Sequence, residues 1–380
     1  MSDPLDSAQS AASGARSEPK ASEVQRGSIG ICCNPASGKD VRRLAARASV
    51  FDNQEKQAIV RRAVVGAIAA GARSFRFVPD THDLAANALA EFAGEIDAQE
   101  VAAPRTGSVL DTMRGAASLQ AAGCGAVITL GGDGTNRAFA TAWRDAPLLP
   151  VSTGTNNVFP RFVEATLAGA AAGFVATGRA PLAECARRAK AVSVEIAGEK
   201  PDLALIDAVL TQDRFVGARA LLDADRLVLA LLTRADPAGV GITSIGGLIE
   251  PVGDEDDAAL LLEFGDGAGV VHAPIAPGFY QDVRVRSVRR VAFGEAVELS
   301  GAGALAFDGE RERVLAPGQR ATLSVRRDGP WVIDVPRVLA RAAREGWLTT
   351  GFASSSRSKS LRASGCSSQS SLAIGADKSQ

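Results

Sequence analysis

Short runs of β-branched and other apolar residues alternate with longer segments rich in alanine and leucine between residues 27 and 190. This alternation predicts βαβ units that share a parallel sheet. The expected strands are 28–33, 74–78, 126–130 and 148–151, and the expected helices are 54–70, 83–93, 108–122, 136–143 and 164–178. The first half is therefore predicted to be an α/β domain with a doubly wound, Rossmann-like parallel sheet.

The pattern changes after about residue 191, where short strand-like stretches are separated by glycine, proline and aspartate. Such spacing is typical of antiparallel sheets. The expected strands are 192–196, 203–210, 259–264, 283–288, 296–299, 321–325 and 331–335, followed by an amphipathic helix over 337–345. We expect an α/β domain over 27–190 and a β-rich domain over 191–349, with a site in the cleft between them.

Both ends of the chain differ from the middle in composition. Residues 1–26 are poor in large apolar side chains, and residues 353–380 include 11 serines. Neither segment buries enough apolar surface to offset the entropy of ordering. We expect disordered tails over 1–26 and 350–380, and neither a secretory signal nor a run of about 20 apolar residues that could cross a bilayer.

Charge and cysteine content narrow the range of partners. The 42 basic and 43 acidic side chains give a net charge of -1, which attracts neither nucleic acid nor an anionic membrane. The five cysteines are scattered, and the two histidines lie far from any cysteine pair, so the spacing of a structural zinc site is absent. These features predict a cytoplasmic protein with a small-molecule substrate, and they leave the oligomeric state open.

The strongest chemical motif is the Asp133 turn, Gly131-Gly132-Asp133-Gly134-Thr135, which joins the expected strand 126–130 to a helix. Glycines let the backbone approach phosphates closely, and successive N–H groups at a helix start bind anions. Asp133 would orient a metal ion or take a proton from an attacking hydroxyl group. The alternative is a tight turn in which Asp133 only caps the helix.

Two further loops of small polar residues follow expected strands. The Asn34 loop spans residues 34–39 and ends in Lys39, and the Thr153 loop spans residues 153–157. The Asn34 loop lacks the Walker A spacing, and either loop alone is compatible with an ordinary turn. Because parallel strands end at the same edge of a sheet, the three loops together predict one phosphate-binding site.

At these three loops the sequence resembles the superfamily of NAD kinases and diacylglycerol kinases. The Asp133 turn is similar to the signature of both branches, and 34–38 resembles the first nucleotide loop of the lipid kinases. Residues 154–157 are similar to the Gly-Thr-x-Asn loop of the superfamily. The sequence departs from the lipid kinases at 158–160, where Val-Phe-Pro stands in place of an acidic residue.

The resemblance extends to the second half. Asp308-Gly309-Glu310 looks like the turn that returns a second acidic pair to the active site, which implies Asp308 as a metal ligand and Glu310 as a catalytic group. The same Asp-Gly pair also predicts a hairpin turn. Residues 241–247 resemble a glycine-rich substrate turn that contains Thr243, and Asp207 stands where NAD kinases carry an asparagine.

The combination of residues 34–40, 48–52, 153–157 and 213–218 resembles most closely the bacterial subgroup of ATP-NAD kinases that includes the acetoin catabolism protein X. This resemblance implies a nucleotide-binding kinase domain over 27–190 and a substrate domain over 191–349. The resemblance implies Mg²⁺-assisted phosphoryl transfer from ATP or polyphosphate to NAD, with Asp133 and Glu310 as catalytic residues. It assigns to the nucleotide Asn34, Ser37, Gly38, Lys39, Gly131, Gly132, Gly134, Thr135, Thr153, Gly154, Thr155 and Asn157, and to the acceptor Asn156, Asp207 and Thr243. The alternatives are a diacylglycerol-type lipid kinase and a non-catalytic protein that senses nucleotides.

Overall fold

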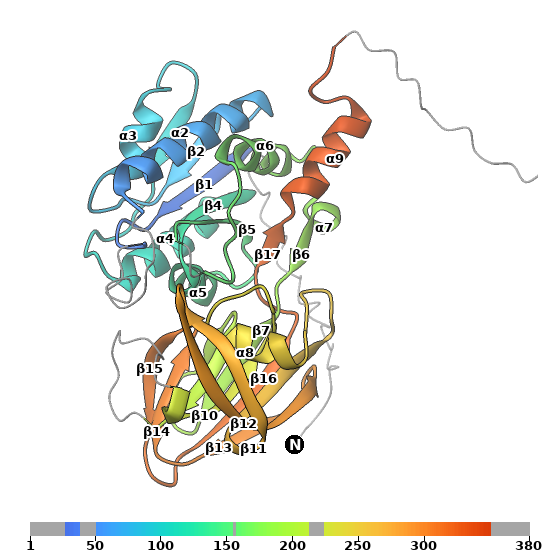
Figure 1. The fold of residues 1–380 in the computed structure, drawn as a ribbon. Helices are drawn as coiled ribbons and strands as arrows, with labels where there is room; N and C mark the ends of the chain where they lie inside the picture. Colours follow the sequence, from blue (N-terminus) through green and yellow to red (C-terminus); the bar gives the residue numbers. More distant parts are fainter. Residues whose placement is uncertain (1–26, 39–50, 155–156, 213–223, 351–380) are drawn as a thin grey trace, which may run out of the picture.

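The computed structural model describes residues 27–38, 51–154, 157–212 and 224–350. An α/β domain with a parallel sheet lies against a domain of antiparallel sheets (Figure 1). The fold class predicted from the sequence is confirmed.

The α/β domain is built on a seven-stranded sheet. In spatial order its strands are β3 (Asp97–Glu100), β2 (Ser74–Phe77), β1 (Ser28–Cys33), β4 (Ala126–Gly131), β5 (Pro147–Ser152), β17 (Trp331–Ile333) and β6 (Ala186–Arg188). All neighbours are parallel except β6, which runs antiparallel to β17. Because β1, β4 and β5 are buried along their whole length, their carboxyl ends hold the following loops on a rigid base.

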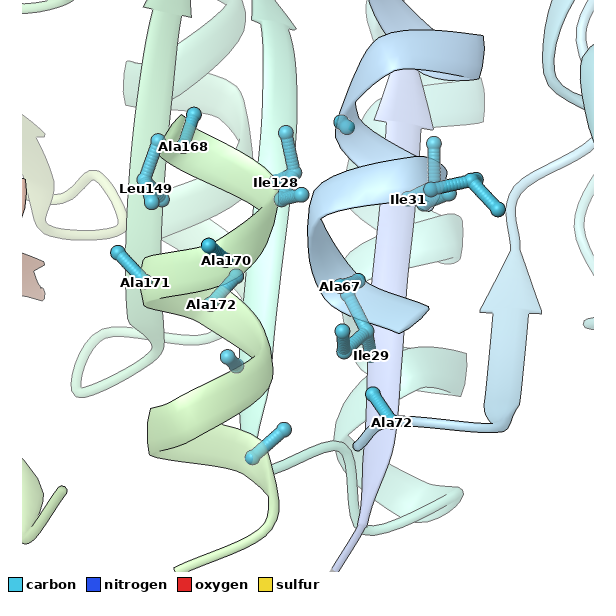
Figure 2. Close-up of a cluster of buried hydrophobic side chains, with 14 of the residues drawn as sticks. Ile29, Ile31, Ala67, Ala72, Ile128, Leu149, Ala168, Ala170, Ala171 and Ala172 are labelled. Atoms are coloured by element: carbon cyan, nitrogen blue, oxygen red, sulfur yellow. The ribbon is translucent and has the colours of Figure 1, made fainter. Parts of the chain in front are cut away.

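Helices cover both faces of this sheet, as a doubly wound fold requires. One face packs against α2 (Asn53–Ala69), α3 (Leu84–Ala90), α6 (Ala165–Ala176) and α9 (Val335–Glu345), and Figure 2 shows α2 and α6 over the central strands. The other face packs against α4 (Val109–Ala121) and α5 (Asp133–Ala142). The contact between α2 and α6 depends on glycine, because a methyl group on Gly66 would overlap the carbonyl oxygen of Thr166.

The second domain consists of two antiparallel sheets. The six-stranded sheet has the order β12 (Phe279–Ala292), β11 (Ala258–Ala276), β10 (Leu227–Leu232), β9 (Asp207–Thr211), β14 (Gly303–Phe307) and β15 (Glu310–Leu315). The four-stranded sheet has the order β13 (Val297–Ser300), β16 (Arg320–Arg326), β7 (Ala191–Ile196) and β8 (Asp202–Ala204). Apolar side chains from both sheets form one core, and α8 (Ile242–Ile249) packs on the six-stranded sheet. The 3₁₀ helix η1 (Ala224–Arg226) precedes β10, and α7 (Leu182–Cys185) precedes β6.

The structure differs from the sequence prediction in two places that matter for the site. The expected strand 203–210 is divided into β8 and β9, which belong to different sheets. The segment 331–345, expected in the β-rich domain, instead returns to the α/β domain, where β17 pairs with β5 and α9 packs against α6. The tails expected to be disordered lie outside the described residues.

Among the described residues, no helix combines the length and the apolar character needed to cross a membrane.

Candidate active site

The Asp133 turn connects β4 to α5 and is held by hydrogen bonds to side chains of these two elements. Gly132 caps α5, and Asp133 is its first residue. The buried Thr129 hydroxyl donates to Asn136 Oδ1 at 2.7 Å, and Asn136 Nδ2 donates to the Gly132 carbonyl oxygen at 2.9 Å. Glycine is needed at position 131 because an added Cβ would lie 2.5 Å from Thr135 Cβ. The N–H groups at the start of α5 therefore have a fixed direction.

The Asn34 loop is tied to both neighbouring loops. Asn34 Nδ2 donates to Thr135 Oγ1 at 2.8 Å, and the hydroxyl oxygens of Ser37 and Thr153 are 2.7 Å apart. Gly38 has a φ of +77°, and a Cβ there would lie 2.5 Å from the Thr153 carbonyl oxygen. The three predicted loops thus form one arrangement. Lys39 lies outside the described residues.

The buried Lys56 of α2 binds the backbone of the Asn34 loop. Its Nζ donates to the carbonyl oxygens of Asn34, Pro35 and Ser37 at 3.0, 2.9 and 2.6 Å. The sequence interpretation missed this residue. The signal was present, because Lys56 precedes Ile59 by three positions and so lies on the apolar face of its helix.

The Thr153 loop is closed at its base and faces the Asp133 turn. Ser152 N–H donates to the Arg161 carbonyl oxygen at 2.9 Å, which brings the two ends of the segment 152–161 together. Asn157 Nδ2 donates to Ser152 Oγ at 2.8 Å, and a Cβ on Gly132 would lie 2.8 Å from Asn157 Oδ1. Thr155 and Asn156 lie outside the described residues.

Asp133 joins this loop to the start of α5. Its carboxylate accepts the Phe159 N–H at 2.7 Å and the Val158 N–H at 3.0 Å. Burial raises the pKa of the Asp133 carboxyl to about 7, the two N–H groups oppose that rise, and the negative charge of Asp308 adds to it. A carboxyl that is close to half ionised at neutral pH is well suited to accept a proton during catalysis.

Asp308 comes from the second domain, in the turn between β14 and β15. Asp308 and Gly309 have φ values of 51° and 82°, as expected for a two-residue hairpin turn. The Asp308 carboxylate accepts the N–H groups of Leu205 and Ile206 at 2.9 and 2.7 Å. The predicted hairpin and the predicted acidic group therefore coexist, and these contacts hold the bend between β8 and β9.

Asp207 begins β9 directly after that bend. It is 7% exposed, and its Oδ1 has no hydrogen-bond partner among the described residues. Burial is the largest cause of a strongly raised pKa of Asp207, followed by the charges of Asp308 and Asp133. Buried polar atoms are nearly always paired in folded proteins. The unpaired Oδ1 can therefore accept a hydrogen bond from a further polar group.

Two predicted residues of the second domain, Thr243 and Glu310, remain. Thr243 lies in α8 and is 1% exposed, and its hydroxyl also has no hydrogen-bond partner among the described residues. The glycine-rich stretch around it is a helix rather than a turn. The side chain of Glu310 lies outside the described part of the chain, although its backbone begins β15.

Arg137 connects the two domains. It lies one helical turn after Asp133 and donates from Nε to the Leu203 carbonyl oxygen at 2.7 Å and from Nη2 to Asp202 at 2.9 Å. Its guanidinium also stacks on Phe307, 5.1 Å from the ring centroid. This contact between the domains could not be predicted from a local pattern, because the hydrogen-bond partners of Arg137 lie more than 60 positions away.

The described residues do not form a metal site of their own. They contain no group of three His, Cys, Asp or Glu side chains with metal-binding geometry, and both Asp308 oxygens accept backbone N–H groups. A carboxylate oxygen that accepts an N–H group keeps a second lone pair, so the metal role expected for Asp308 is compatible with these bonds and stays a prediction.

Two family models match the chain, the ATP-NAD kinase N-terminal domain at residues 29–180 and the acetoin catabolism protein X C-terminal domain at residues 190–328. Acetoin catabolism protein X of Cupriavidus necator is 35% identical over 333 residues, which cover 83% of this chain and 92% of that protein. The chain belongs to the acetoin catabolism protein X family. It is thereby a kinase-type member of the NAD kinase and diacylglycerol kinase superfamily, as the sequence predicted.

Solved structures with a related arrangement are more distant. Yeast NADH kinase complexed with NADH has a TM-score of 0.48 at 13% identity, covering 86% of this chain and 89% of that chain. A diacylglycerol kinase from Bacillus anthracis has a TM-score of 0.39 at 12% identity, covering 82% and 98%. An NAD kinase from Archaeoglobus fulgidus in complex with ATP has a TM-score of 0.36 at 13% identity, covering 73% and 99%. In this member of the acetoin catabolism protein X family, the first matched region ends at residue 180 and the second begins at residue 190, so α7 and β6 lie between them.

Proposed function

We propose that this chain is a kinase that transfers a phosphoryl group from ATP or polyphosphate to NAD and so forms NADP. The observation that carries the proposal is the position of Asp133. The turn that carries it is bonded to the Asn34 loop through Thr135, its carboxylate is held by the N–H groups of Val158 and Phe159 just after the Thr153 loop, and burial raises its pKa to about 7.

The donor phosphates would lie at the start of α5. The N–H groups and the dipole of a helix N-terminus favour anions, and Gly131 and Gly132 let Thr135 and Asn157 lie close to the turn. The side chains of Asn34, Ser37 and Thr153 add polar groups to the same edge of the sheet. Mg²⁺ usually binds through phosphates and only one or two carboxylates, and on the donor it would supply charge neutralisation.

The proposed transfer is direct. The acceptor hydroxyl oxygen forms a bond to the terminal phosphorus while the bond from that phosphorus to the leaving phosphate oxygen breaks. Asp133 accepts the proton of the hydroxyl, and the shortened nucleotide or polyphosphate leaves with the electron pair. The hydrogen bonds from Val158 and Phe159 keep the carboxylate oriented in both charge states.

A polar acceptor is favoured over a lipid by the second domain. The buried Asp207 presents an oxygen that finds no partner in the described part of the chain, and a buried polar atom that stays unpaired costs about 1–3 kcal/mol. The hydroxyl and amide groups of a dinucleotide can satisfy that atom, whereas diacylglycerol offers mostly hydrocarbon. The matched ATP-NAD kinase domain supports NAD as the acceptor, and the name of the relative suggests a link with acetoin catabolism.

A cytoplasmic location fits the chemistry of the thiols. Cys32, Cys33, Cys124 and Cys185 are all unbridged and buried, and free thiols are maintained in reducing compartments.

An acceptor screen tests this function. Purified protein with Mg²⁺ and either ATP or polyphosphate is offered NAD, NADH or a short-chain diacylglycerol in separate reactions. We expect phosphorylated product with NAD or NADH and none with the lipid. Turnover with the lipid alone would favour the lipid kinase alternative, and tight nucleotide binding without any product would favour the sensing protein.

A further inference from the structure

Arg234 reaches from the second domain to the loop that holds Asp133. It follows β10, and its Nη1 donates to the Val158 carbonyl oxygen at 3.1 Å. The N–H of the same residue, Val158, donates to Asp133 at 3.0 Å. One residue of the loop is therefore bound on one side by Arg234 and on the other side by the proposed base.

Asp254 holds Arg234 in place and also binds the far end of the same loop. Its Oδ1 lies 2.8 Å from Arg234 Nη2, and its Oδ2 lies 3.1 Å from Arg161 Nη2. The Arg161 carbonyl oxygen in turn accepts the N–H that closes the segment 152–161. The Arg234 side chain is only 14% exposed, so this ion pair is less screened by solvent than a surface pair.

The position of Asp254 is itself fixed by cations around its backbone. Lys190 Nζ donates to the carbonyl oxygens of Gly253 and Ala258 at 2.8 and 2.9 Å. Arg327 Nη1 donates to the Asp254 carbonyl oxygen at 2.9 Å. The segment 253–257 therefore presents Asp254 to the α/β domain from a well-supported position.

We propose that Arg234, held by Asp254, is a positioning residue for Asp133, because it fixes the Val158 peptide against the catalytic carboxylate and makes the reactive arrangement depend on contact between the two domains. The inference rests on the proposed function, in which Asp133 is the base. The charged groups around Arg234 and Asp133 are Asp207, Asp308, Asp236, Asp254, Arg161 and Lys190. The charge of Arg234 also lowers the pKa of Asp133, so its loss would move the pH dependence upward.

Amide hydrogen exchange tests whether Arg234 and Asp254 hold the Val158 peptide, and this test does not require an active enzyme. In Arg234→Met and Asp254→Asn we expect the N–H groups of Val158 and Phe159 to exchange about tenfold faster or more. The matched control is Glu255→Gln in the same acidic segment, because the exposed Glu255 side chain pairs with Arg187 and contacts neither end of the loop. Exchange that stays at the wild-type rate in both variants would overturn the proposal.

Kinetics separate positioning from simple structural support. Arg234→Met should lower kcat by about 10- to 100-fold, leave the KM for ATP nearly unchanged and shift the acidic limb of the pH profile upward. Arg234→Lys, which keeps the charge, should recover part of kcat and restore the pH profile. Suppose that the wild-type enzyme is active and that Asp133→Asn inactivates it. An unchanged kcat and pH profile in Arg234→Met would then refute the positioning role of Arg234, while the proposed function stands. If the wild-type protein transfers no phosphoryl group, the proposed function fails, and the exchange rates alone show whether Arg234 holds the Val158 peptide.

Discussion

The carboxylate of Asp133 and the backbone N–H of Phe159 are joined by a hydrogen bond of 2.7 Å. This bond connects the first residue of α5 to the loop that follows β5, so it links two successive βα units at the edge of the sheet. Asp133 thus helps to organise the loops and is also placed for proton transfer. A structural role and a catalytic role for this residue are compatible.

The activity should depend on the ionisation of Asp133. Burial raises the pKa of this carboxyl to about 7, and only the ionised form accepts a proton. We therefore expect kcat/KM to be highest above about pH 7 and to fall about tenfold per pH unit well below it. A pH profile of kcat/KM measures this limb, and a profile that stays flat down to pH 5 would contradict the role of Asp133.

Lys56→Met should destabilise the protein and weaken nucleotide binding. The change leaves three carbonyl oxygens of the Asn34 loop without their buried cation. We expect a loss of about 2–4 kcal/mol in the free energy of unfolding, measured by urea denaturation, together with a higher KM for ATP. The control is the exposed Lys200→Met, for which we expect almost no change. A loss as small as that of the control would show that the contacts of Lys56 contribute little.

Gly131→Ala should weaken ATP binding without unfolding the protein. The added methyl group would lie 2.5 Å from Thr135 Cβ, so Thr135 must move and its bond from Asn34 is lost. We expect the Kd for ATP to rise about tenfold or more, equivalent to at least about 1.4 kcal/mol, as measured by calorimetry. Gly94→Ala is a matched control because no atom lies near its Cβ position. Equal affinity in the two variants would argue against donor binding at the Asp133 turn.

Asp207→Ala should affect the acceptor rather than the donor. Asp207 Oδ1 is buried and has no partner within residues 27–38, 51–154, 157–212 and 224–350, and in the proposed function a polar group of the acceptor binds it. We expect the KM for the acceptor to rise about tenfold while the KM for ATP stays the same. Asp266→Ala, at an exposed position in β11, provides the comparison. An effect of Asp207→Ala on the KM for ATP alone would place Asp207 on the donor side.

Much of the site could be predicted because parallel strands end at one edge of a sheet. The strands β1, β4 and β5 are buried apolar runs that are followed by glycine or small polar residues, so these strands and their loops could be predicted from the sequence. By contrast, β3 consists of four exposed residues, Asp97–Glu100, and carries no apolar pattern that could reveal it.

The contacts that complete the site are long-range, and a local pattern does not show them. The bend that separates β8 from β9 is stabilised by Asp308, 103 positions after Leu205. Arg234 acts on Val158 across 76 positions. Each of these residues also occurs commonly on protein surfaces, so its type alone gave no reason to place it at the site.

The most direct test of the proposed function compares the rates at which the wild-type protein and Asp133→Asn transfer a phosphoryl group to NAD. Both are measured with Mg²⁺ and ATP at pH 8, and thermal denaturation checks that the variant is folded. We predict that the wild-type protein forms NADP and that the folded variant loses about 10³-fold or more of kcat, since it cannot accept the proton. A folded Asp133→Asn variant that forms NADP at the wild-type rate would contradict the central claim.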